Sequence, residues 1–391
     1  MQKYDVHFCL VSDQAAANLL PILDNQFKPK EAVLIVSKKM KQKAEFLAKT
    51  FKEQGVKVTL FNLSDEFDFS KMEEELIELV SQYEDKNIAL NVTGGTKLIS
   101  IAAEHAFTLV EKPIFYIDTK SHRIVFITKD ENKQWLPDLA LNSKNTIKTY
   151  LSAYGSNVLK QSDPSEHKKW LDHIDGFITK YQDNKNIIPV LNKMASLAKN
   201  KGWKYDLEHQ DLKFSGVTDL LTWLDYKNII DFDGVQVDFR NKSTANFLSG
   251  GWLENYTYEV LNSVNKIEDI ALGIEVTNSK YRQDKKDYDA LNKGHKNEFD
   301  VAFMAKNKLH IIECKTMIMD REEGIKAEDI LYKLETLKDY GGLLTKKCLV
   351  SYFEVPESVK NRAKFLNIEI IQGKDLQRIK TKVQEWIGDE S

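Results

Sequence analysis

Three charged residues in two neighbouring apolar segments have the types and spacing that a hydrolytic site needs. Asp300 lies in the segment Asn-Glu-Phe-Asp-Val, and Glu313 and Lys315 lie in Ile-Glu-Cys-Lys-Thr. Alternate residues of a strand point to the same face, so Glu313 and Lys315 share a face, while Cys314 points to the core. A surface Glu–Lys pair at a strand edge is the simpler interpretation. The apolar neighbours favour a central strand, where an unpaired charge is costly.

The turn between these two segments predicts their register. We expect residues 306–307 to form a two-residue hairpin loop, which would pair Ala305 with Lys308. The same register places Asp300 directly opposite Glu313. Directly opposed residues of antiparallel strands have Cβ atoms about 4.5–5.5 Å apart. A loop longer by one residue would break this alignment.

Two carboxylates at such a spacing repel each other unless a cation lies between them. Mg²⁺ and Mn²⁺ both prefer oxygen ligands, so these residue types favour neither ion over the other. Such an ion polarises a phosphodiester oxygen and lowers the pKa of a bound water, while Lys315 is placed to orient that water and to stabilise charge on the phosphate. Glu254, in the first turn of the helix that opens this region, is a candidate third carboxylate ligand.

A second group of polar residues lies near the N-terminus, in Asn-Val-Thr-Gly-Gly-Thr-Lys (residues 91–97) between a predicted strand and a predicted helix. The glycines let the backbone approach a ligand closely, and the helix that follows offers free N–H groups to an anion. This is neither a Walker loop nor a GxGxxG loop, so ATP or NAD is not indicated. A glycine turn that serves only packing is the alternative.

Two more polar segments, residues 12–14 and 37–39, follow predicted strands. Both belong at the carboxyl edge of a parallel sheet, where ligands bind in such folds. Lys38 and Lys39 are interpreted as a solvated face rather than as ligand groups.

The elements that must position the N-terminal group alternate cleanly between strand and helix. This alternation predicts parallel pairing with right-handed crossovers, and hence a doubly wound α/β domain over residues 1–144. The expected strands cover residues 4–11, 32–37, 56–63 and 87–92, the expected helices cover 15–23, 41–54, 70–83 and 97–110, and a hairpin covers 113–118 and 123–128.

The middle of the chain, residues 145–245, is mostly helical. Asp163-Pro164-Ser165-Glu166 predicts a helix start, and a hairpin is expected to turn at Asp233-Gly234. Further helices are expected at residues 188–200 and 217–225. Helices before a hairpin predict a winged-helix-like connector. Because the candidate recognition helix has no cluster of Arg and Lys, a spacer is favoured over a DNA-binding element.

The last region, residues 246–391, has the predicted core order helix, three strands, helix, strand, in an α/β domain. Gly341-Gly342 is expected to end its second helix. The expected helices cover residues 252–264, 327–340, 358–365 and 375–387, and the expected strands cover 270–277, 299–305, 309–315, 348–353 and 368–371.

This pattern resembles the PD-(D/E)XK nuclease family, a restriction-endonuclease-like fold. Its D…ExK motif maps onto Asp300, Glu313 and Lys315, and the Glu that many members carry on the preceding helix maps onto Glu254. The proline that usually precedes the first Asp is absent here. The resemblance implies an endonuclease in which Asp300, Glu313 and Glu254 bind Mn²⁺ or Mg²⁺.

The glycine loop resembles the CARF domain, a Rossmann-like fold that senses cyclic oligoadenylates, and the whole chain resembles the CRISPR ancillary nucleases of type III antiviral systems. The resemblance implies a homodimer that holds one activator ring across its two-fold axis. A ring of four adenylates has matching symmetry, so cyclic tetra-adenylate is the expected ligand, with ring size still open. The residues implied to line this site are Ser12, Asp13, Gln14, Thr93, Gly94, Gly95, Thr96 and Lys97.

Composition limits the possible partners. With 56 Lys and Arg against 59 Asp and Glu, the net charge is -3, so any nucleic-acid surface is a local patch. Cys9, Cys314 and Cys348 include no CxxC pair, which favours buried reduced thiols over a disulfide or zinc framework. Neither a signal peptide nor a run of about 18 apolar residues is present. We therefore expect a cytoplasmic protein without a membrane partner.

The expected activity is allosterically gated phosphodiester hydrolysis with little sequence preference, since no base-reading element is evident. Single-stranded RNA, single-stranded DNA and nicked duplex DNA all remain open as substrates. One alternative is a nucleotide-sensing regulator that binds DNA through the connector. Another is a restriction or repair nuclease without a gate. Degradation of the ligand by the N-terminal domain is not indicated, because residues 93–97 contain no histidine or carboxylate.

Overall fold

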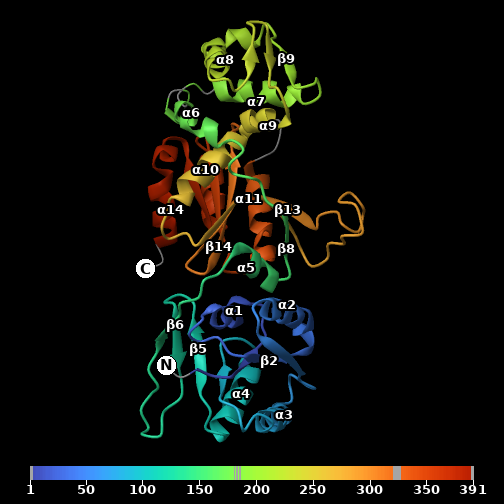
Figure 1. The fold of residues 1–391 in the computed structure, drawn as a ribbon, viewed down its shortest axis with the longest axis vertical. Helices are drawn as coiled ribbons and strands as arrows, with labels where there is room; N and C mark the ends of the chain where they lie inside the picture. The colour runs from blue at the N-terminus through green and yellow to red at the C-terminus, as the bar shows by residue number, and fades with distance from the viewer. Residues whose placement is uncertain (1–2, 180, 182–183, 185, 320–326, 389–391) are drawn as a thin grey trace.

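The computed structural model describes residues 3–179, 181, 184, 186–319 and 327–388. It contains three bodies in a row, with the C-terminal domain between the N-terminal domain and the connector (Figure 1). The order of the bodies along the molecule therefore differs from their order along the chain.

The N-terminal domain is a seven-stranded sheet with helices on both faces, as predicted (Figure 1). Its strand order is β3-β2-β1-β4-β5-β6-β7, in which β3 to β5 are parallel and β6 and β7 are antiparallel. The strands are β1 Val6–Leu10, β2 Glu31–Val36, β3 Lys57–Asn62, β4 Ile88–Asn91, β5 Ile114–Asp118, β6 Arg123–Phe126 and β7 Leu139–Ala140. The helices are α1 Ala16–Leu23, α2 Lys41–Glu53, α3 Phe69–Ser81 and α4 Lys97–Leu109.

Strand β1 is buried on both faces, which accounts for its continuous apolar sequence. Phe8 and Leu10 belong to the core that also contains residues of α3 and α4. Cys9 and Val11 point the other way, into the core shared with α1 and α2. The doubly wound arrangement follows from this two-sided burial.

A short helix and strand, α5 Ile147–Ala153 and β8 Asn157–Lys160, join the N-terminal domain to the rest of the chain. The sequence analysis did not anticipate β8. Tyr150 of α5 and Tyr154, which caps the C-terminal end of α5, lie in one continuous hydrophobic core that contains residues of α1 and α2 as well as residues of the C-terminal domain. The hydroxyl of Tyr154 accepts the backbone N–H of Ala16 at 3.4 Å. The two domains are therefore packed together through α5.

The connector contains helices followed by a hairpin, as predicted, and its hairpin turns at Gly234 with φ +95°. A third strand, β9, joins the hairpin in a sheet of order β10-β11-β9. The helix start predicted at Asp163 is wrong, because the Asp163 carboxylate binds Ser165 in a local turn and α6 begins only at Lys168. The elements are α6 Lys168–Thr179, α7 Ile187–Ala198, β9 Lys204–Asp206, α8 Val217–Tyr226, β10 Asp231–Phe232, β11 Gln236–Asp238 and α9 Lys242–Asn246.

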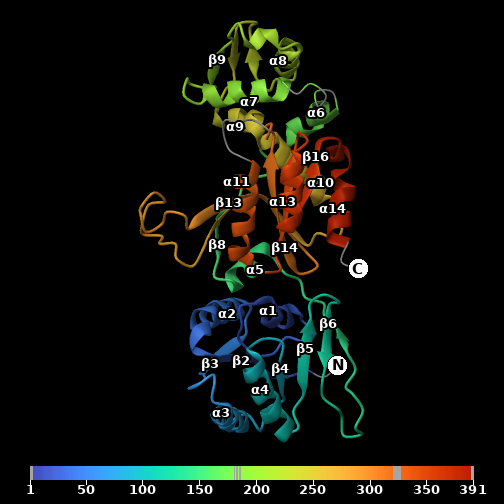
Figure 2. The same ribbon diagram turned by 180° about the vertical axis from the view of Figure 1, so that it is seen from behind.

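The C-terminal domain is built on a six-stranded sheet of order β16-β15-β14-β13-β12-β8, with helices on both faces (Figure 2). The helix predicted over residues 327–340 is divided at Leu337 into α11 and α12, and Gly342 follows with φ +74°. The helices are α10 Trp252–Asn262, α11 Ala327–Thr336, α12 Lys338–Gly341, α13 Glu357–Phe365 and α14 Ile379–Gly388. The strands are β12 Asp269–Thr277, β13 Lys296–Ala305, β14 Lys308–Lys315, β15 Lys346–Ser351 and β16 Ile368–Gln372.

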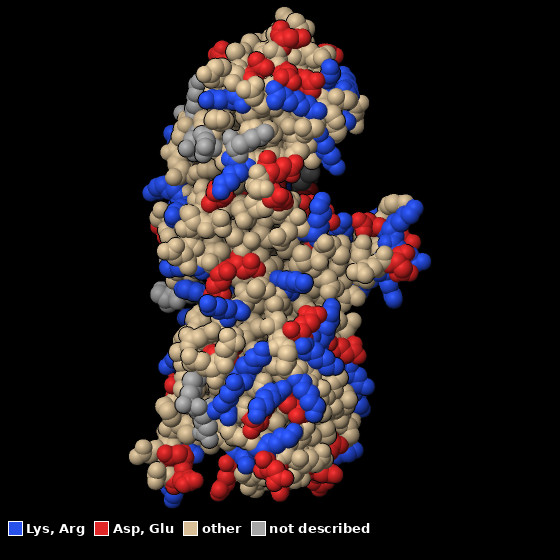
Figure 3. All heavy atoms as spheres, in the orientation of Figure 1, with Lys and Arg blue, Asp and Glu red and all other residues tan. Residues whose placement is uncertain are grey.

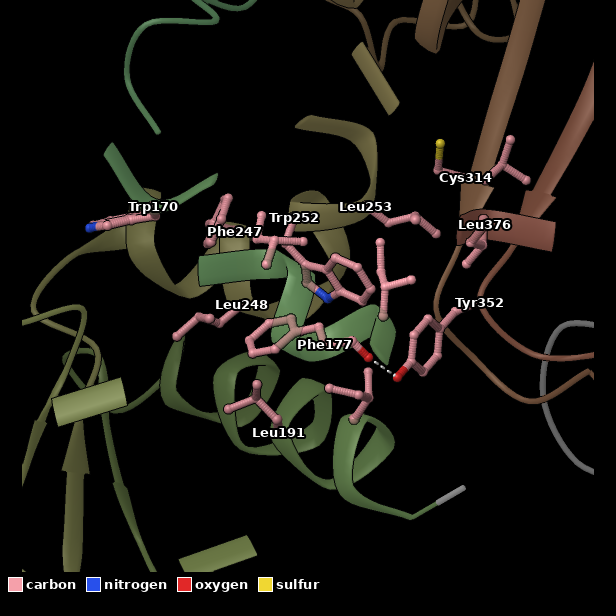
Figure 4. Close-up of a cluster of buried hydrophobic side chains, with 14 of the residues drawn as sticks. Trp170, Phe177, Leu191, Phe247, Leu248, Trp252, Leu253, Cys314, Tyr352 and Leu376 are labelled. Carbon is pink, nitrogen blue, oxygen red and sulfur yellow. Dashed lines mark hydrogen bonds between the residues drawn. The ribbon is translucent and has the colours of Figure 1, made fainter. Parts of the chain in front are cut away.

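A buried aromatic group joins the connector to the C-terminal domain (Figure 4). Trp252 of α10 packs edge-on against Phe177 of α6 at 5.2 Å and against Tyr352 at 5.3 Å between ring centroids. The Tyr352 hydroxyl donates to the carbonyl oxygen of Phe177. This packing fixes the N-terminal end of α10, which carries Glu254.

Candidate active site and ligand site

The β13–β14 hairpin confirms the predicted register. Its turn residues Lys306 and Asn307 have φ of +49° and +57°, as a type I′ turn requires. Ala305 pairs with Lys308 directly across this turn. The two-residue turn at Lys306 and Asn307 therefore sets the pairing of the two strands, as the sequence predicted.

Asp300 and Glu313 lie just beyond the last pair of the ladder, Val301 with Ile312. The Asp300 Oδ2 accepts the backbone N–H of Cys314 at 2.7 Å, which holds the carboxylate at the end of β14. The hairpin therefore brings the two predicted carboxylates to one place.

Lys315 lies between these carboxylates. Its Nζ is 2.6 Å from Glu313 Oε1 and 3.8 Å from Asp300 Oδ2. Burial alone would lower the pKa of Lys315, but the two carboxylates outweigh it and raise that pKa above its usual range. Cys314 is buried on the other face, as predicted, with its thiol 3.7 Å from the hydroxyl of Thr257. Cys9 and Cys348 are also buried and free.

A second lysine, Lys333 of α11, also binds Glu313. Its Nζ lies 2.9 Å from Oε1 and 3.0 Å from Oε2 of that carboxylate. Burial raises the pKa of Glu313, but Lys315 and Lys333 lower that pKa by more than burial raises it. This carboxylate is therefore ionised. Lys333 was absent from the sequence prediction, because a lysine within an amphipathic helix carries no motif.

Glu254 faces the same group from the first turn of α10. Burial, together with the charge of Asp300, raises the pKa of Glu254 to about 8. Burial and the charge of Glu313 likewise raise the pKa of Asp300 to about 6. Burial thus makes both carboxyl groups harder to ionise than usual, and a positive charge beside them would favour the ionised form.

The donor set fits a hard divalent cation, because Glu254, Asp300 and Glu313 supply oxygen ligands in a buried, acidic setting. Among the described residues, however, no three acidic, histidine or cysteine side chains stand close enough to form a ready-made metal cage. The chemistry of the residues therefore fits a metal, while the lysines hold Glu313 in its place.

The site opens into a cleft of about 780 Å³ between the C-terminal domain and the connector. Glu254 and Lys315 line one side, and His167, Asn192 and Lys242 of the connector line the other. Asn192 Nδ2 donates to Thr316 Oγ1 at 2.9 Å, which ties the connector to the end of β14. The connector is therefore one wall of the cleft.

The predicted ligand loop lies against the end of β1. A Cβ atom at Gly94 would lie 2.1 Å from the carbonyl oxygen of Leu10 and 3.3 Å from the hydroxyl of Ser12. Gly95 has φ +79°, a conformation that favours glycine. The glycines thus bring residues 93–97 next to Ser12 at the carboxyl edge of the sheet.

The two threonines of this loop hold the fold together. Thr93 Oγ1 accepts the backbone N–H of Ile117 at 2.7 Å and donates to Asn91 Oδ1 at 2.6 Å. Thr96 Oγ1 caps α4 by accepting the N–H of Ile99 at 3.3 Å. Their hydroxyls shape the loop, whereas the sequence analysis expected them to serve the ligand.

The remaining polar groups around this loop are more open. Lys97 is exposed, and Lys43 of α2, which the sequence analysis did not select, lies 3.8 Å from Asp13. Among the described residues, none satisfies the buried Oε1 of Gln14. Figure 3 shows Lys and Arg side chains gathered on the face of the N-terminal domain that is turned to the viewer. This edge therefore suits an anionic, hydrogen-bonding ligand.

Two family models match the two ends of the chain. Residues 6–150 match the family model of the Card1 CARF domain, and residues 241–389 match that of the Card1-like endonuclease domain. The chain belongs to the Card1-like CARF endonucleases. No curated protein matches the sequence.

Solved structures share the fold of this Card1-like endonuclease over its full length. VC1899 from Vibrio cholerae superposes with a TM-score of 0.84 at 21% identity, covering 98% of each chain. Can2 from Sulfobacillus thermosulfidooxidans, solved with cyclic tetra-adenylate, gives 0.78 at 24% identity, covering 99% of each chain. A type III CRISPR defence DNA nuclease activated by cyclic oligoadenylate gives 0.51 at 16% identity, covering 92% of this chain and 47% of its own.

A helix that crosses a membrane needs about 20 predominantly apolar residues. Within the part of the chain that the structure describes, no helix is both long and apolar enough to cross a bilayer.

We expect a divalent cation to stabilise the protein more strongly as the pH rises from about 6 to about 8. These two pH values correspond to the raised pKa of Asp300, about 6, and the raised pKa of Glu254, about 8. In the folded, metal-free protein these groups keep protons that an unfolded chain loses near pH 4. Their contribution to stability is complete at low pH and is lost as pH rises through the raised pKa values. A bound cation offsets that loss.

Thermal denaturation with and without millimolar Mg²⁺ at both ends of this pH range measures the effect. Each kcal/mol added to the free energy of unfolding raises Tm by roughly 2–4 °C. The variant Glu254→Gln should lose the upper part of the pH dependence. An equal Tm shift at both pH values would contradict the prediction.

Proposed function

We propose that this Card1-like endonuclease is a metal-dependent nuclease of the PD-(D/E)XK type that cyclic tetra-adenylate switches on in type III CRISPR antiviral defence. One observation carries the proposal: the β13–β14 hairpin brings Asp300 and Glu313 beside Lys315, which lines the cleft together with Glu254. We assign sensing to residues 1–144, cutting to residues 246–391, and one wall of the cleft to residues 145–245.

The metal would be held by Asp300, Glu313 and Glu254. When bound, Mg²⁺ or Mn²⁺ supplies an activated water and polarises the phosphate. Lys315 is already fixed beside both strand carboxylates, so its ammonium group is placed to stabilise negative charge on the scissile phosphate. Asp300 keeps its orientation through the Cys314 N–H group.

The activator is proposed to bind at the carboxyl edge of the N-terminal sheet. Can2, which shares this fold, was solved with cyclic tetra-adenylate, and a four-membered ring matches the two-fold axis of a homodimer. Lys97 is exposed at the N-terminal end of α4, where a phosphate gains from backbone N–H groups and the helix dipole. The residues proposed to line the site are Ser12, Asp13, Gln14, Thr93, Gly94, Gly95, Thr96 and Lys97.

The connector is proposed to act on the substrate as part of the cleft, without reading DNA sequence. Its α8, the candidate recognition helix, carries no Lys or Arg. Two lysines of residues 145–245 line the cleft, Lys160 and Lys242, and both are positioned to meet a phosphate backbone. Contacts of this kind favour cleavage with little sequence preference.

A cleavage assay tests the proposal. Labelled single-stranded RNA, single-stranded DNA and supercoiled plasmid are incubated with Mn²⁺, with and without cyclic tetra-adenylate, using Glu313→Ala as the control. We expect cleavage only when the activator and Glu313 are both present. Cleavage without activator would favour an ungated nuclease, and full activity of Glu313→Ala would place the active site elsewhere. No cleavage with any ring size would favour a nucleotide-sensing DNA-binding regulator.

A further inference from the structure

The carboxylate of Glu313 is fully engaged by cations from the protein itself. Lys333 contacts both oxygens, at 2.9 and 3.0 Å, while Lys315 contacts Oε1 at 2.6 Å. A lysine that bridges two carboxylate oxygens occupies the position that a metal ion bound to the same carboxylate needs. Both oxygens of Glu313 are therefore paired with a lysine, and a metal ion that binds between them must displace Lys333.

The two lysines differ in how easily each can leave. The side chain of Lys315 is 24% exposed and lies between two carboxylates, whereas that of Lys333 is 41% exposed and contacts only Glu313 among the described acidic side chains. The ammonium of a partly exposed lysine regains hydration when it moves into solvent, and a divalent cation that takes its place keeps the buried Glu313 carboxylate paired. Lys333 is therefore the cation that can be displaced, and Lys315 is the one that stays.

The helix that carries Lys333 contributes to the same hydrophobic core as the sensor domain. Leu334 and Leu337, beside it in the chain, belong to the continuous core that includes Tyr154 at the C-terminal end of α5 and residues of α1. Helix α1 begins directly after the proposed activator segment, residues 12–14. A shift of α1 against α5 therefore has a packed route to the helix of Lys333.

We propose that Lys333 is an internal counter-ion that occupies the metal face of Glu313 in the resting enzyme and must be displaced before a divalent cation binds there. This rests on the proposed function, since it requires Glu313 to be a metal ligand. It makes Lys333 a positioning residue that sets the metal affinity of the site, distinct from Lys315, which acts on the substrate.

Metal binding without substrate or activator tests this directly. Free Mn²⁺ is titrated by electron paramagnetic resonance against the full-length wild type, Lys333→Met and Lys338→Met. Lys338 is the matched control, because it is 42% exposed and pairs with Glu335 rather than with a carboxylate of the site. We expect Lys333→Met to bind Mn²⁺ about tenfold more tightly than wild type, and Lys338→Met to bind as wild type does. Glu313→Gln should abolish the gain when combined with Lys333→Met.

The outcomes separate this inference from the function on which it rests. Wild-type binding of Mn²⁺ with no change, or weaker binding, in Lys333→Met overturns the counter-ion while leaving the nuclease proposal intact. Equal gains in Lys333→Met and Lys338→Met reduce the effect to net charge and also overturn it. If neither wild type nor Lys333→Met binds Mn²⁺, the metal-dependent function fails together with the inference. Equal binding of cyclic tetra-adenylate by all variants confirms that each is folded.

Discussion

Replacing Asp300 by asparagine is expected to lower the rate of metal-dependent cleavage by about 1,000-fold, which corresponds to roughly 4 kcal/mol in the activation free energy. Asparagine keeps the size of the side chain, and its amide oxygen can still accept the Cys314 N–H group that Asp300 binds at 2.7 Å. The substitution therefore removes the negative charge and leaves the hairpin in place. Single-turnover cleavage at saturating activator and Mn²⁺ measures the effect.

The matched control for this prediction is Asp284→Asn. Asp284 is 73% exposed on the loop between β12 and β13, so the same chemical change there should leave the rate unaltered. Thermal denaturation of both variants verifies the fold. Wild-type activity of a folded Asp300→Asn protein would show that this carboxylate is not a metal ligand.

Replacing Gly94 by alanine is expected to weaken binding of cyclic tetra-adenylate by at least about 100-fold, or roughly 3 kcal/mol. The added Cβ would lie 2.1 Å from the carbonyl oxygen of Leu10. Because that atom belongs to the backbone, the loop itself must move away from the end of β1. The movement separates residues 93–97 from Ser12, the two sides of the proposed site. Calorimetric titration with the ring measures the loss, and the cleavage assay should show a matching rise in the activator concentration required.

Two variants show whether the loss at Gly94 is specific. Gly55→Ala, in the same domain, adds a Cβ at φ +77° with no atom within 4 Å, so it should alter stability and leave ligand binding unchanged. Lys97→Ala removes an exposed charge without changing the packing. It should weaken binding of the cyclic tetra-adenylate ring even if Gly94→Ala fails to fold. Unchanged activation of Lys97→Ala would contradict the position of the sensor site.

The parts of the fold that the sequence predicted are those governed by local rules. Alternating strands and helices led to the doubly wound N-terminal domain because the central strands β1, β2 and β4 are buried on both faces. The register of β13 and β14 followed from the two-residue turn at Lys306 and Asn307, since that turn admits only one pairing. The proximity of Asp300 and Glu313 could therefore be predicted from the turn alone.

The parts that the sequence missed depend on contacts between distant segments. Lys333 binds Glu313 from a helix 20 positions further along the chain, and no spacing rule connects them. Strand β8 is four residues long and acquires its partner only when β12 is in place. Asp163 has the residue type of a helix cap, but its carboxylate binds within its own turn. Tertiary packing decided each of these cases.

The place of β8 at the edge of the C-terminal sheet changes how the connector relates to the rest of the molecule. Because β8 precedes the helices and hairpin of the connector, α6 to α9, and pairs with β12, the catalytic sheet contains chain from both sides of these elements. The connector is thus an insert within the nuclease domain, and its two ends both lie along the same cleft. The covalent link from sensor to nuclease runs through α5 and β8 before the insert begins. Evolution, or a protein engineer, can therefore vary the outer part of the insert to change what enters the cleft, provided that Phe177 and Asn192 keep their contacts with the nuclease domain.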